Sequence, residues 1–293
     1  KKLRHNEYYD MQSHFDFLYA QSANGQHFYG LLDLMQSNEN IRLAYRNIKR
    51  NTGSKMAGYD GLTIEDLKKL SVSEVVSKIQ RMFERYIPQA VRRVFIPKAN
   101  GKTRPLGIPT IWDRLFQQCI LQVLEPICEA KFYKHSYGFR PNRSTHHAKA
   151  RFETLINRAC LYHCVDVDIK GFFDNVNHTK LLKQMWSLGI RDKALLSIIS
   201  RLLKAEIIGE GFPKKGTPQG GILSPLLSNI VLNELDWWVS NQWESLETRK
   251  LYKTYNGRYN ALKQSNLKYC YIVRYADDFK ILCRTRSQAI KMF

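Results

Sequence analysis

The 293-residue chain lacks any run of 18 apolar residues, so no segment has the length and hydropathy of a membrane-spanning helix. Its first residues, Lys1 to Asn6, are polar and basic and do not lead into the apolar core of a secretory signal. Acidic side chains are scarce, with 26 Asp and Glu against 46 Lys and Arg and a net charge of +20. Such an excess favours a polyanionic partner, and we expect that partner to be nucleic acid and not a membrane.

Paired metal-binding cysteine motifs are also missing. The six cysteines show no repeated zinc-knuckle spacing, and the small cluster of Cys160, His163 and Cys164 has no second half elsewhere in the chain. We therefore predict free thiols, buried or half-buried, in a reducing compartment. Together with the polar N-terminus, this predicts a cytoplasmic location, in a bacterium or in the matrix of an organelle.

Two adjacent carboxylates, Asp277 and Asp278, stand between two segments with the composition of strands. Residues 269–274 and 279–283 are rich in β-branched and aromatic side chains, and the second segment alternates apolar with polar residues. Asp is common in tight turns, so the sequence predicts a hairpin whose tip carries both acids. Adjacent like charges repel unless a cation lies between them. Taken alone, residues 275–278 are more often a solvated turn than a catalytic one.

Further acidic residues lie in a separate predicted strand, residues 164–169. Apolar side chains alternate there with Asp166 and Asp168, which places the two acids together on the opposite face. Asp168 ends this strand, and we expect it to meet Asp277 and Asp278 across a sheet. Three converging carboxylates require divalent cations, and two Mg²⁺ ions about 3.5–4 Å apart suit their hard oxygen ligands.

Basic and glycine-rich segments accompany these acids. Residues 92–109 predict a hairpin with an Asn-Gly turn. Lys98 and Arg104 flank the turn and could clamp a triphosphate, although a solvated edge hairpin would carry similar charges. The loop 136–144 combines arginines with aromatics, a mixture suited to phosphate contact and base stacking. The loop 214–225 either brings backbone close to a ligand or forms an ordinary junction with the helix that follows.

Helical patterns and local charge complete the description of the chain. Helical periodicity covers residues 14–50 and returns at 73–85 and 111–130. Between Ile41 and Arg104, 15 basic residues stand against 5 acidic ones, which favours a phosphate-facing surface over a merely solvated one. Residues 241–268 are polar, basic and aromatic, and they predict a helical insertion that does not belong to the core.

Taken in order, the motifs resemble those of reverse transcriptases, and the residues within each motif are most similar to those of group II intron-encoded reverse transcriptases (maturases). The motifs that carry this resemblance are residues 92–109, 136–144, 168–174, 216–221 and 275–278. The resemblance spans nearly the whole chain and implies an α+β right-hand polymerase fold. It implies fingers and palm subdomains, an antiparallel palm sheet that carries the catalytic carboxylates, and no thumb, because the chain stops at Phe293 where family members continue.

The resemblance also implies subdomain boundaries and residue roles. The expected parts are a helical, RNA-contacting N-terminal extension at 1–60, fingers at 61–130, and a palm at 131–293 with a fingers-like segment near 176–215 and a helical insertion near 241–268. The implied catalytic ligands of two Mg²⁺ ions are Asp168, Asp277 and Asp278, with the carbonyl of Ile169. The implied nucleotide-binding residues are Lys98, Arg104, Phe173 and Gln219. The cations expected to bind RNA are Lys49, Arg50, Arg92, Arg93, Arg140 and Arg143.

The function implied is an RNA-directed DNA polymerase of a group II intron. It would copy intron RNA into DNA during retrohoming, and the parent protein would bind intron RNA to assist splicing. Its partners would be group II intron RNA, an RNA template with a DNA primer, and deoxynucleoside triphosphates, with a homodimer left open. The alternative is a catalytically silent RNA-binding splicing cofactor of the same fold, but all three carboxylates are intact. A two-metal nuclease would leave the triphosphate-binding residues without a purpose.

We predict that Phe173 discriminates against ribonucleotides. It stands five residues after Asp168, where the resemblance places an aromatic ring beneath C2′ of the incoming sugar. Phe173→Val in the full-length enzyme is expected to raise ribonucleotide incorporation, because the smaller side chain no longer clashes with a 2′-hydroxyl. Primer extension with each class of nucleotide measures the ratio of deoxy- to ribonucleotide use. An unchanged ratio would place the gate elsewhere.

Overall fold

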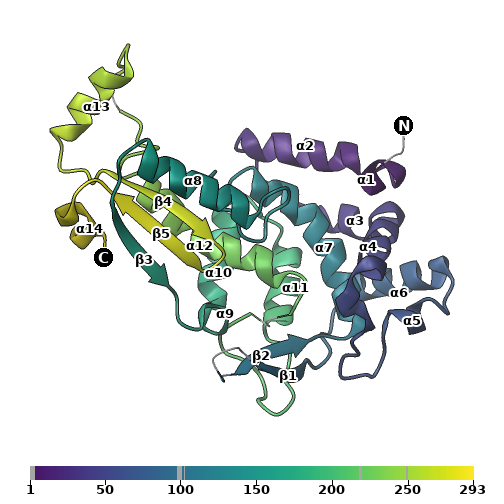
Figure 1. The fold of residues 1–293 in the computed structure, drawn as a ribbon. Coiled ribbons are helices and arrows are strands. Elements are labelled where there is room, and N and C mark those ends of the chain that lie inside the picture. Colours follow the sequence, from purple (N-terminus) through teal and green to yellow (C-terminus); the bar gives the residue numbers. More distant parts are fainter. Residues whose placement is uncertain (1–3, 98–100, 102, 218–219, 249) are drawn as a thin grey trace. The chain divides into compact units, whose positions relative to one another are not determined.

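The structure is a computed structural model that describes residues 4–97, 101, 103–217, 220–248 and 250–293. Two compact units make up the chain, and each is discontinuous in sequence (Figure 1). Unit 1 comprises Lys1–Lys131 and Gly171–Ser228, and unit 2 comprises Phe132–Lys170 and Asn229–Phe293. The subdomain boundaries expected from the sequence stay a prediction. None of the described helices is long and apolar enough to cross a membrane.

Unit 1 is mainly helical in the part of the chain that the structure describes. Its helices are α1 (His5–Tyr8), α2 (Gln12–Ala23), α3 (Leu31–Met35), α4 (Asn38–Arg50), η1 (Thr52–Lys55, a 3-10 helix), α5 (Ile64–Leu67), α6 (Val72–Glu84), α7 (Ile111–Glu129), α9 (Phe172–Asn175), α10 (His178–Ser187) and α11 (Lys193–Leu203). Helix α7 is buried on most of its circumference, and α2, α3, α4 and α6 pack against it. Because a helix that is apolar nearly all round must be covered on all sides, α7 forms the core of the unit. The helix predicted over 111–130 is confirmed.

The predicted hairpin is present in unit 1. Strands β1 (Arg92–Pro97) and β2 (Thr103–Ile108) are antiparallel, with Arg92 opposite Ile108 and Pro97 opposite Thr103. Residues 98–100 and 102, which connect the two strands in the sequence, lie outside the described residues.

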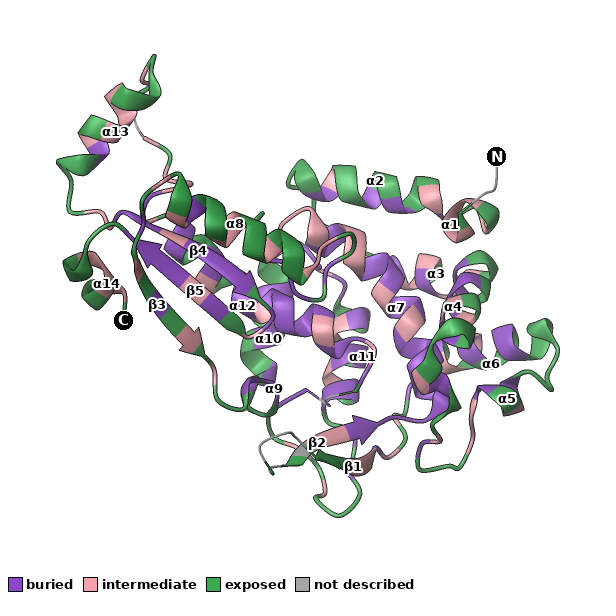
Figure 2. Cartoon of the chain, in the orientation of Figure 1, coloured by how far each residue is buried: buried purple, intermediate pink, exposed green. Residues whose placement is uncertain are grey.

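Unit 2 is built on an antiparallel sheet of three strands in the order β3–β5–β4. Its elements are β3 (His163–Asp168), β4 (Cys270–Tyr275), β5 (Asp278–Cys283), α8 (Thr145–Asn157), α12 (Ser224–Ser240, within this unit from Asn229), α13 (Tyr255–Lys263) and α14 (Arg286–Met292). One sheet face packs its apolar side chains against α12 and α14. On the other face α8 covers β4, whereas β3 keeps an exposed edge. Figure 2 shows the buried residues concentrated on β4 and β5.

A half-buried carboxylate, Glu244, anchors the loop that precedes α8. It accepts hydrogen bonds from the Tyr133 hydroxyl at 2.5 Å and from Arg151 Nη2 at 3.2 Å. Lys134 Nζ lies 3.1 Å and His135 Nε2 lies 3.4 Å from Glu244 Oε1. Burial alone would raise the pKa of Glu244, but the hydrogen bonds donated to it outweigh burial and lower the pKa to about 2.

We predict that Glu244 makes the stability of the fold depend on acid. The pKa of Glu244 is lower in the folded chain than the usual 4.5. The ionised side chain therefore contributes to the unfolding free energy above about pH 4.5, and this contribution is lost as the pH falls toward 2. The difference corresponds to about 3 kcal/mol of unfolding free energy. Glu244→Gln is expected to flatten the decline in unfolding free energy between about pH 5 and pH 3, measured by urea denaturation. An equally steep decline in both proteins would assign it to other carboxylates.

Candidate active site

The structure brings the predicted carboxylates to one end of the unit 2 sheet. Asp168, the last residue of β3, lies directly opposite Asp278, the first residue of β5. On the other side of β5, Asp278 faces Tyr275, the last residue of β4. Residues opposite one another in antiparallel strands have Cα atoms about 4.5–5.5 Å apart. Asp277 lies in the two-residue turn, Ala276–Asp277, that joins β4 to β5. Asp168 therefore meets Asp278 across the sheet, as the sequence suggested.

The turn is shorter than expected, because it contains Asp277 but not Asp278. Asp278 is already a strand residue, and Ala276 takes the first position of the turn with a φ of 57°. Residues other than glycine seldom adopt this left-handed backbone conformation, because their Cβ crowds the backbone. The Ala276 carbonyl accepts a hydrogen bond of 2.7 Å from Nη1 of Arg274, a residue that the sequence analysis did not single out. The only feature of the sequence that could have indicated Arg274 is its position as an arginine within a largely apolar strand.

A lysine that the sequence analysis also missed stands among the acids. Lys280 Nζ lies 2.5 Å from Asp166 Oδ1 and 3.6 Å from Asp278 Oδ1. The hydrogen bond to Asp166 is the main cause of a raised pKa of Lys280. Asp166, Asp168 and Asp278 are all exposed, so this end of β3 and β5 is an open, charged surface. An open surface of this kind can be reached by a large polyanionic substrate.

The donor chemistry of this end of the sheet suits Mg²⁺. Asp168, Asp277 and Asp278 supply carboxylate oxygens and Ile169 supplies a backbone carbonyl, whereas thiol or imidazole ligands would favour other metals. Among the described residues, no three His, Cys, Asp or Glu side chains are gathered closely enough to hold an ion. The strand register brings the backbones of Asp168 and Asp278 opposite one another, and the carboxylates would have to rotate about their side-chain torsions to converge on one ion.

Two of the predicted nucleotide-binding residues, Phe173 and Arg104, lie in the described part of unit 1. Phe173 lies in α9, is 6% exposed, and packs edge-on against Phe172 with ring centroids 5.6 Å apart. Its carbonyl accepts a 2.7 Å hydrogen bond from the backbone N–H of Thr217. Arg104 lies in β2, opposite Ile96. The other two predicted residues lie outside the described residues, namely Lys98 and Gln219.

The glycine-rich loop comes close to protein backbone. Gly220 has a φ of +112°, and a Cβ placed there would lie 2.4 Å from the carbonyl oxygen of Gly107 in β2. A Cβ at Gly216 would lie 3.0 Å from the carbonyl oxygen of Asp174. These glycines therefore allow the loop to pack against the hairpin and α9. A pocket of about 480 Å³ lies between the hairpin and this loop, and Arg93, Asp174 and Thr217 are among its lining residues.

Two of the six predicted RNA-binding cations, Lys49 and Arg50, are exposed at the end of α4. The hairpin arginines are used within unit 1. Arg92 donates two hydrogen bonds, of 3.1 and 2.7 Å, to the Ala57 carbonyl. Arg93 forms a bidentate ion pair with Glu210, at 2.7 and 2.6 Å.

The loop arginines are used within unit 2. Arg140 is only 6% exposed and donates to the carbonyls of Tyr133 and Ser136, at 2.7 and 2.9 Å. Arg143 donates to the Lys134 carbonyl at 2.5 Å. Both arginines shape the loop before α8 through these bonds, whereas contact with RNA stays a prediction for them.

Comparison with known proteins gives consistent matches. The family model described as "Reverse transcriptase (RNA-dependent DNA polymerase)" matches residues 96–293. Protein YkfC of Escherichia coli (strain K12) is 35% identical over 276 residues, which cover 88% of this chain and 71% of YkfC. Group II intron-encoded protein LtrA of Lactococcus lactis subsp. cremoris is 41% identical over 207 residues, 67% of this chain and 33% of LtrA. The chain thus matches about a third of the length of LtrA.

A solved structure was also found. A chain of the partial Cas6-RT-Cas1–Cas2 complex is 25% identical, with a TM-score of 0.49, and the match covers 87% of this chain and 38% of that one.

We predict that cysteines in the place of Asp168 and Asp278 form a disulfide, because the Cα separation of opposite residues lies within disulfide range. The variant would carry Asp168→Cys and Asp278→Cys, with the exposed Cys160 and Cys164 replaced by Ser. The matched control combines Asp166→Cys with Asp278→Cys, a diagonal pair about 7–8 Å apart. Thiol titration and peptide mass spectrometry after mild oxidation measure the cross-link. Equal cross-linking of the two pairs would contradict the register.

Proposed function

We propose that this chain, which belongs to the reverse transcriptase (RNA-dependent DNA polymerase) family, carries the fingers and palm of an RNA-directed DNA polymerase encoded by a group II intron. The parent protein would copy intron RNA into DNA during retrohoming and bind the intron RNA to assist splicing. Three structural features agree with the α+β fold of the family, namely the helical unit 1, its hairpin and the antiparallel sheet of unit 2.

The observation that carries the proposal is the register of unit 2. Asp168 and Asp278 face one another from paired strands, and Asp277 precedes Asp278 in the adjoining turn. In an RNA-binding protein without catalysis, the repulsion of these acids would serve no purpose. This arrangement favours an enzyme over the alternative of a silent splicing cofactor.

In the proposed reaction, Asp168, Asp277, Asp278 and the Ile169 carbonyl would hold two Mg²⁺ ions. When bound, such ions activate a primer 3′-hydroxyl and stabilise the pyrophosphate that leaves. The chain contributes the placement of the acids by its hydrogen-bonded strands and keeps the acidic face of β3 open to a nucleic-acid duplex. Its net charge of +20 would draw phosphate backbones toward the surface.

We assign the nucleotide to a second group of residues. Lys98 and Arg104 would hold the triphosphate, Phe173 would exclude a 2′-hydroxyl, and Gln219 would lie near the nucleotide and template. The fixed carbonyl of Phe173 supports a rigid gate, because the hydrogen bond from Thr217 limits how α9 can move. The proposed partners are group II intron RNA, a primed RNA template and deoxynucleoside triphosphates, and a homodimer stays a prediction.

The RNA-binding surface is best tested at the end of α4. Lys49 and Arg50 are exposed there, whereas Arg92 and Arg93 donate their hydrogen bonds to protein groups. A substitution of either hairpin arginine would therefore disturb the fold of unit 1 as well as any contact with phosphate.

We predict that catalysis and RNA binding separate. Asp277→Asn is expected to abolish extension of a DNA primer on an RNA template, because a neutral amide is a poor Mg²⁺ ligand, while RNA affinity stays near wild type. Replacing Lys49 and Arg50 with Ala should instead weaken RNA binding and reduce its salt dependence. The slope of log affinity against log salt should fall by about 0.9 for each lost contact on a duplex, and by less on single strands.

Primer extension and a filter-binding salt titration of the full-length protein measure the two effects. The proposed division of roles is wrong if Asp277→Asn loses RNA affinity as severely as the double variant. If the wild-type protein binds intron RNA but extends no primer, the splicing-cofactor alternative replaces the enzyme.

A further inference from the structure

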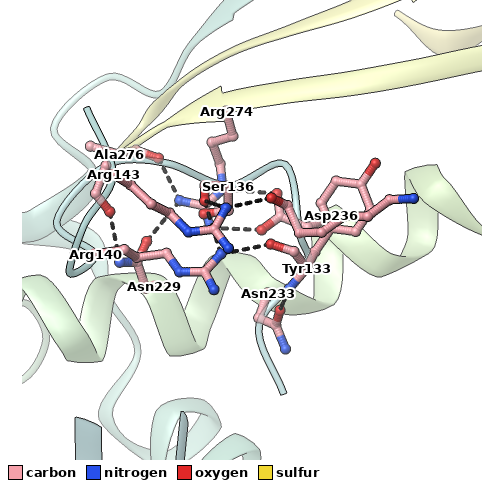
Figure 3. A network of polar contacts seen from close by, with 11 residues as sticks. Tyr133, Ser136, Arg140, Arg143, Asn229, Asn233, Asp236, Arg274 and Ala276 are labelled. Atoms are coloured by element: carbon pink, nitrogen blue, oxygen red, sulfur yellow. Dashed lines mark hydrogen bonds and ion pairs between the residues drawn. The ribbon is translucent and has the colours of Figure 1, made fainter. Parts of the chain in front are cut away.

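A buried ion pair between β4 and α12 contacts the turn that carries Asp277, and Figure 3 shows it together with Asn229 and Ala276. Arg274, near the end of β4, has a side chain that is 1% exposed, and Asp236 of α12 is 0% exposed. Their contact is bidentate, with Nε 2.8 Å from Oδ1 and Nη2 2.6 Å from Oδ2. Such fork-to-fork pairing fixes the plane of the guanidinium as well as its position.

The third nitrogen of this guanidinium, Nη1, forms a hydrogen bond with the turn. Arg274 Nη1 donates to Asn229 Oδ1 at 3.0 Å and to the Ala276 carbonyl at 2.7 Å. Asn229 and Asp236 lie seven residues apart on α12, two helical turns that present them on the same face. One arginine therefore connects a rigid helix to the peptide group that joins Ala276 to Asp277.

The turn is also held from the side of the loop before α8. The Asn229 side-chain amide donates to the Gly138 carbonyl at 2.9 Å. A Cβ at Gly138 would lie 2.2 Å from the backbone nitrogen of Ala276, so the two backbones are in direct contact. The Tyr137 backbone N–H donates to the Arg274 carbonyl at 2.9 Å. The turn is thus confined between α12 and this loop.

Stability alone does not explain this arrangement. Two charges lose their hydration when they are buried, and an apolar pair of similar volume is often as stable or more stable. An apolar pair, however, could not donate to the Ala276 carbonyl. Because the peptide group is planar, fixing that carbonyl fixes the path of the backbone into Asp277. Ala276 needs such support, since its φ of 57° is unfavourable for a residue with a Cβ.

We propose that Arg274 and Asp236 are positioning residues, which hold the Ala276–Asp277 turn so that Asp277 and Asp278 can share a divalent cation with Asp168. This inference rests on the proposed polymerase function for its catalytic meaning. The placement of the turn, and its effect on cation binding, can be tested without catalysis.

The principal variant is Arg274→Lys. Lysine keeps the positive charge beside Asp236 but has a single ammonium group, which cannot serve both carboxylate oxygens and the Ala276 carbonyl together. We expect Mn²⁺ binding, followed by electron paramagnetic resonance of the bound ion, to weaken about tenfold relative to wild type, as expected for the loss of one charge-assisted hydrogen bond. The amide protons of Ala276 and Asp277 should exchange with solvent faster in the variant.

In primer extension, Arg274→Lys is expected to lower the rate at saturating nucleotide by on the order of 10²-fold, as a small misplacement of a reacting group does. Half-maximal activity should need more Mg²⁺, while the KM for the nucleotide changes little, because the described side-chain contacts of Arg274 are to Asp236, Asn229 and Ala276 and not to the residues proposed to bind the nucleotide. Asp277→Asn provides the reference for a lost cation ligand.

The matched control is Arg258→Lys. Arg258 is also a partly buried arginine of unit 2 that donates to a backbone carbonyl, that of Leu246 at 2.6 Å, which belongs neither to the turn nor to the loop before α8. The control should leave Mn²⁺ affinity unchanged. If Arg274→Lys does not fold, Asp236→Asn takes its place, because the amide has the size of the carboxylate but offers a single acceptor oxygen, which ends the bidentate contact that fixes the guanidinium.

The outcomes separate this inference from the proposed function. A folded Arg274→Lys or Asp236→Asn variant that binds Mn²⁺ as wild type does would overturn the positioning role, even if the wild-type protein polymerises. Equal loss of Mn²⁺ affinity in Arg258→Lys would also overturn it, because the effect would then be one of general stability. Weaker Mn²⁺ binding in the Arg274 variant alone, with no extension by the wild-type protein, would sustain the positioning role and reject the polymerase.

Discussion

The hydrogen-bonded register of β5 is the constraint on which the site depends. Each strand has an apolar face, which packs under α12 and α14, and the acidic residues of β3 alternate with those apolar residues. A slip of one residue would turn Asp168 and Asp166 into the core and expose Val165 and Val167. Burying two unpaired carboxylates costs several kcal/mol, so the core enforces the register and the register places Asp168 opposite Asp278.

Some of the positively charged side chains stabilise the protein's own loops, and others are exposed and can face phosphate. Several arginines donate to backbone carbonyls of the protein itself: Arg92 to Ala57, Arg114 to Gly53 and Met56, and Arg140 to Tyr133 and Ser136. These guanidiniums stabilise loops that carry no regular ladder of hydrogen bonds. The net charge of +20 therefore overstates the number of cations that can face phosphate, and the exposed lysines and arginines are the better guide.

The sequence was most informative where the signal is local. The alternation around Asp168, the strands of the hairpin β1–β2 and the apolar periodicity of α7 each depend on residues close together in sequence, and the structure confirms all three. The sequence could not show that β5 is central, because strand order depends on pairing between distant segments. Arg274 and Asp236 were missed for a similar reason. They are 38 residues apart, and charged side chains are so seldom buried that neither suggested a core position.

The discontinuity of unit 2 has a consequence for synthesis on the ribosome. Asp166 of β3 and its partner Lys280 of β5 are 114 residues apart in the chain. At a translation rate of about 5–20 residues per second, roughly 5–25 s pass between the synthesis of β3 and that of β5, the strand that pairs with it. During that interval it is an unpaired strand of the kind that associates with other chains. Its two carboxylates then repel similar strands on neighbouring nascent chains, so the charges that line the edge of the finished sheet also protect the protein from aggregation while it is being made.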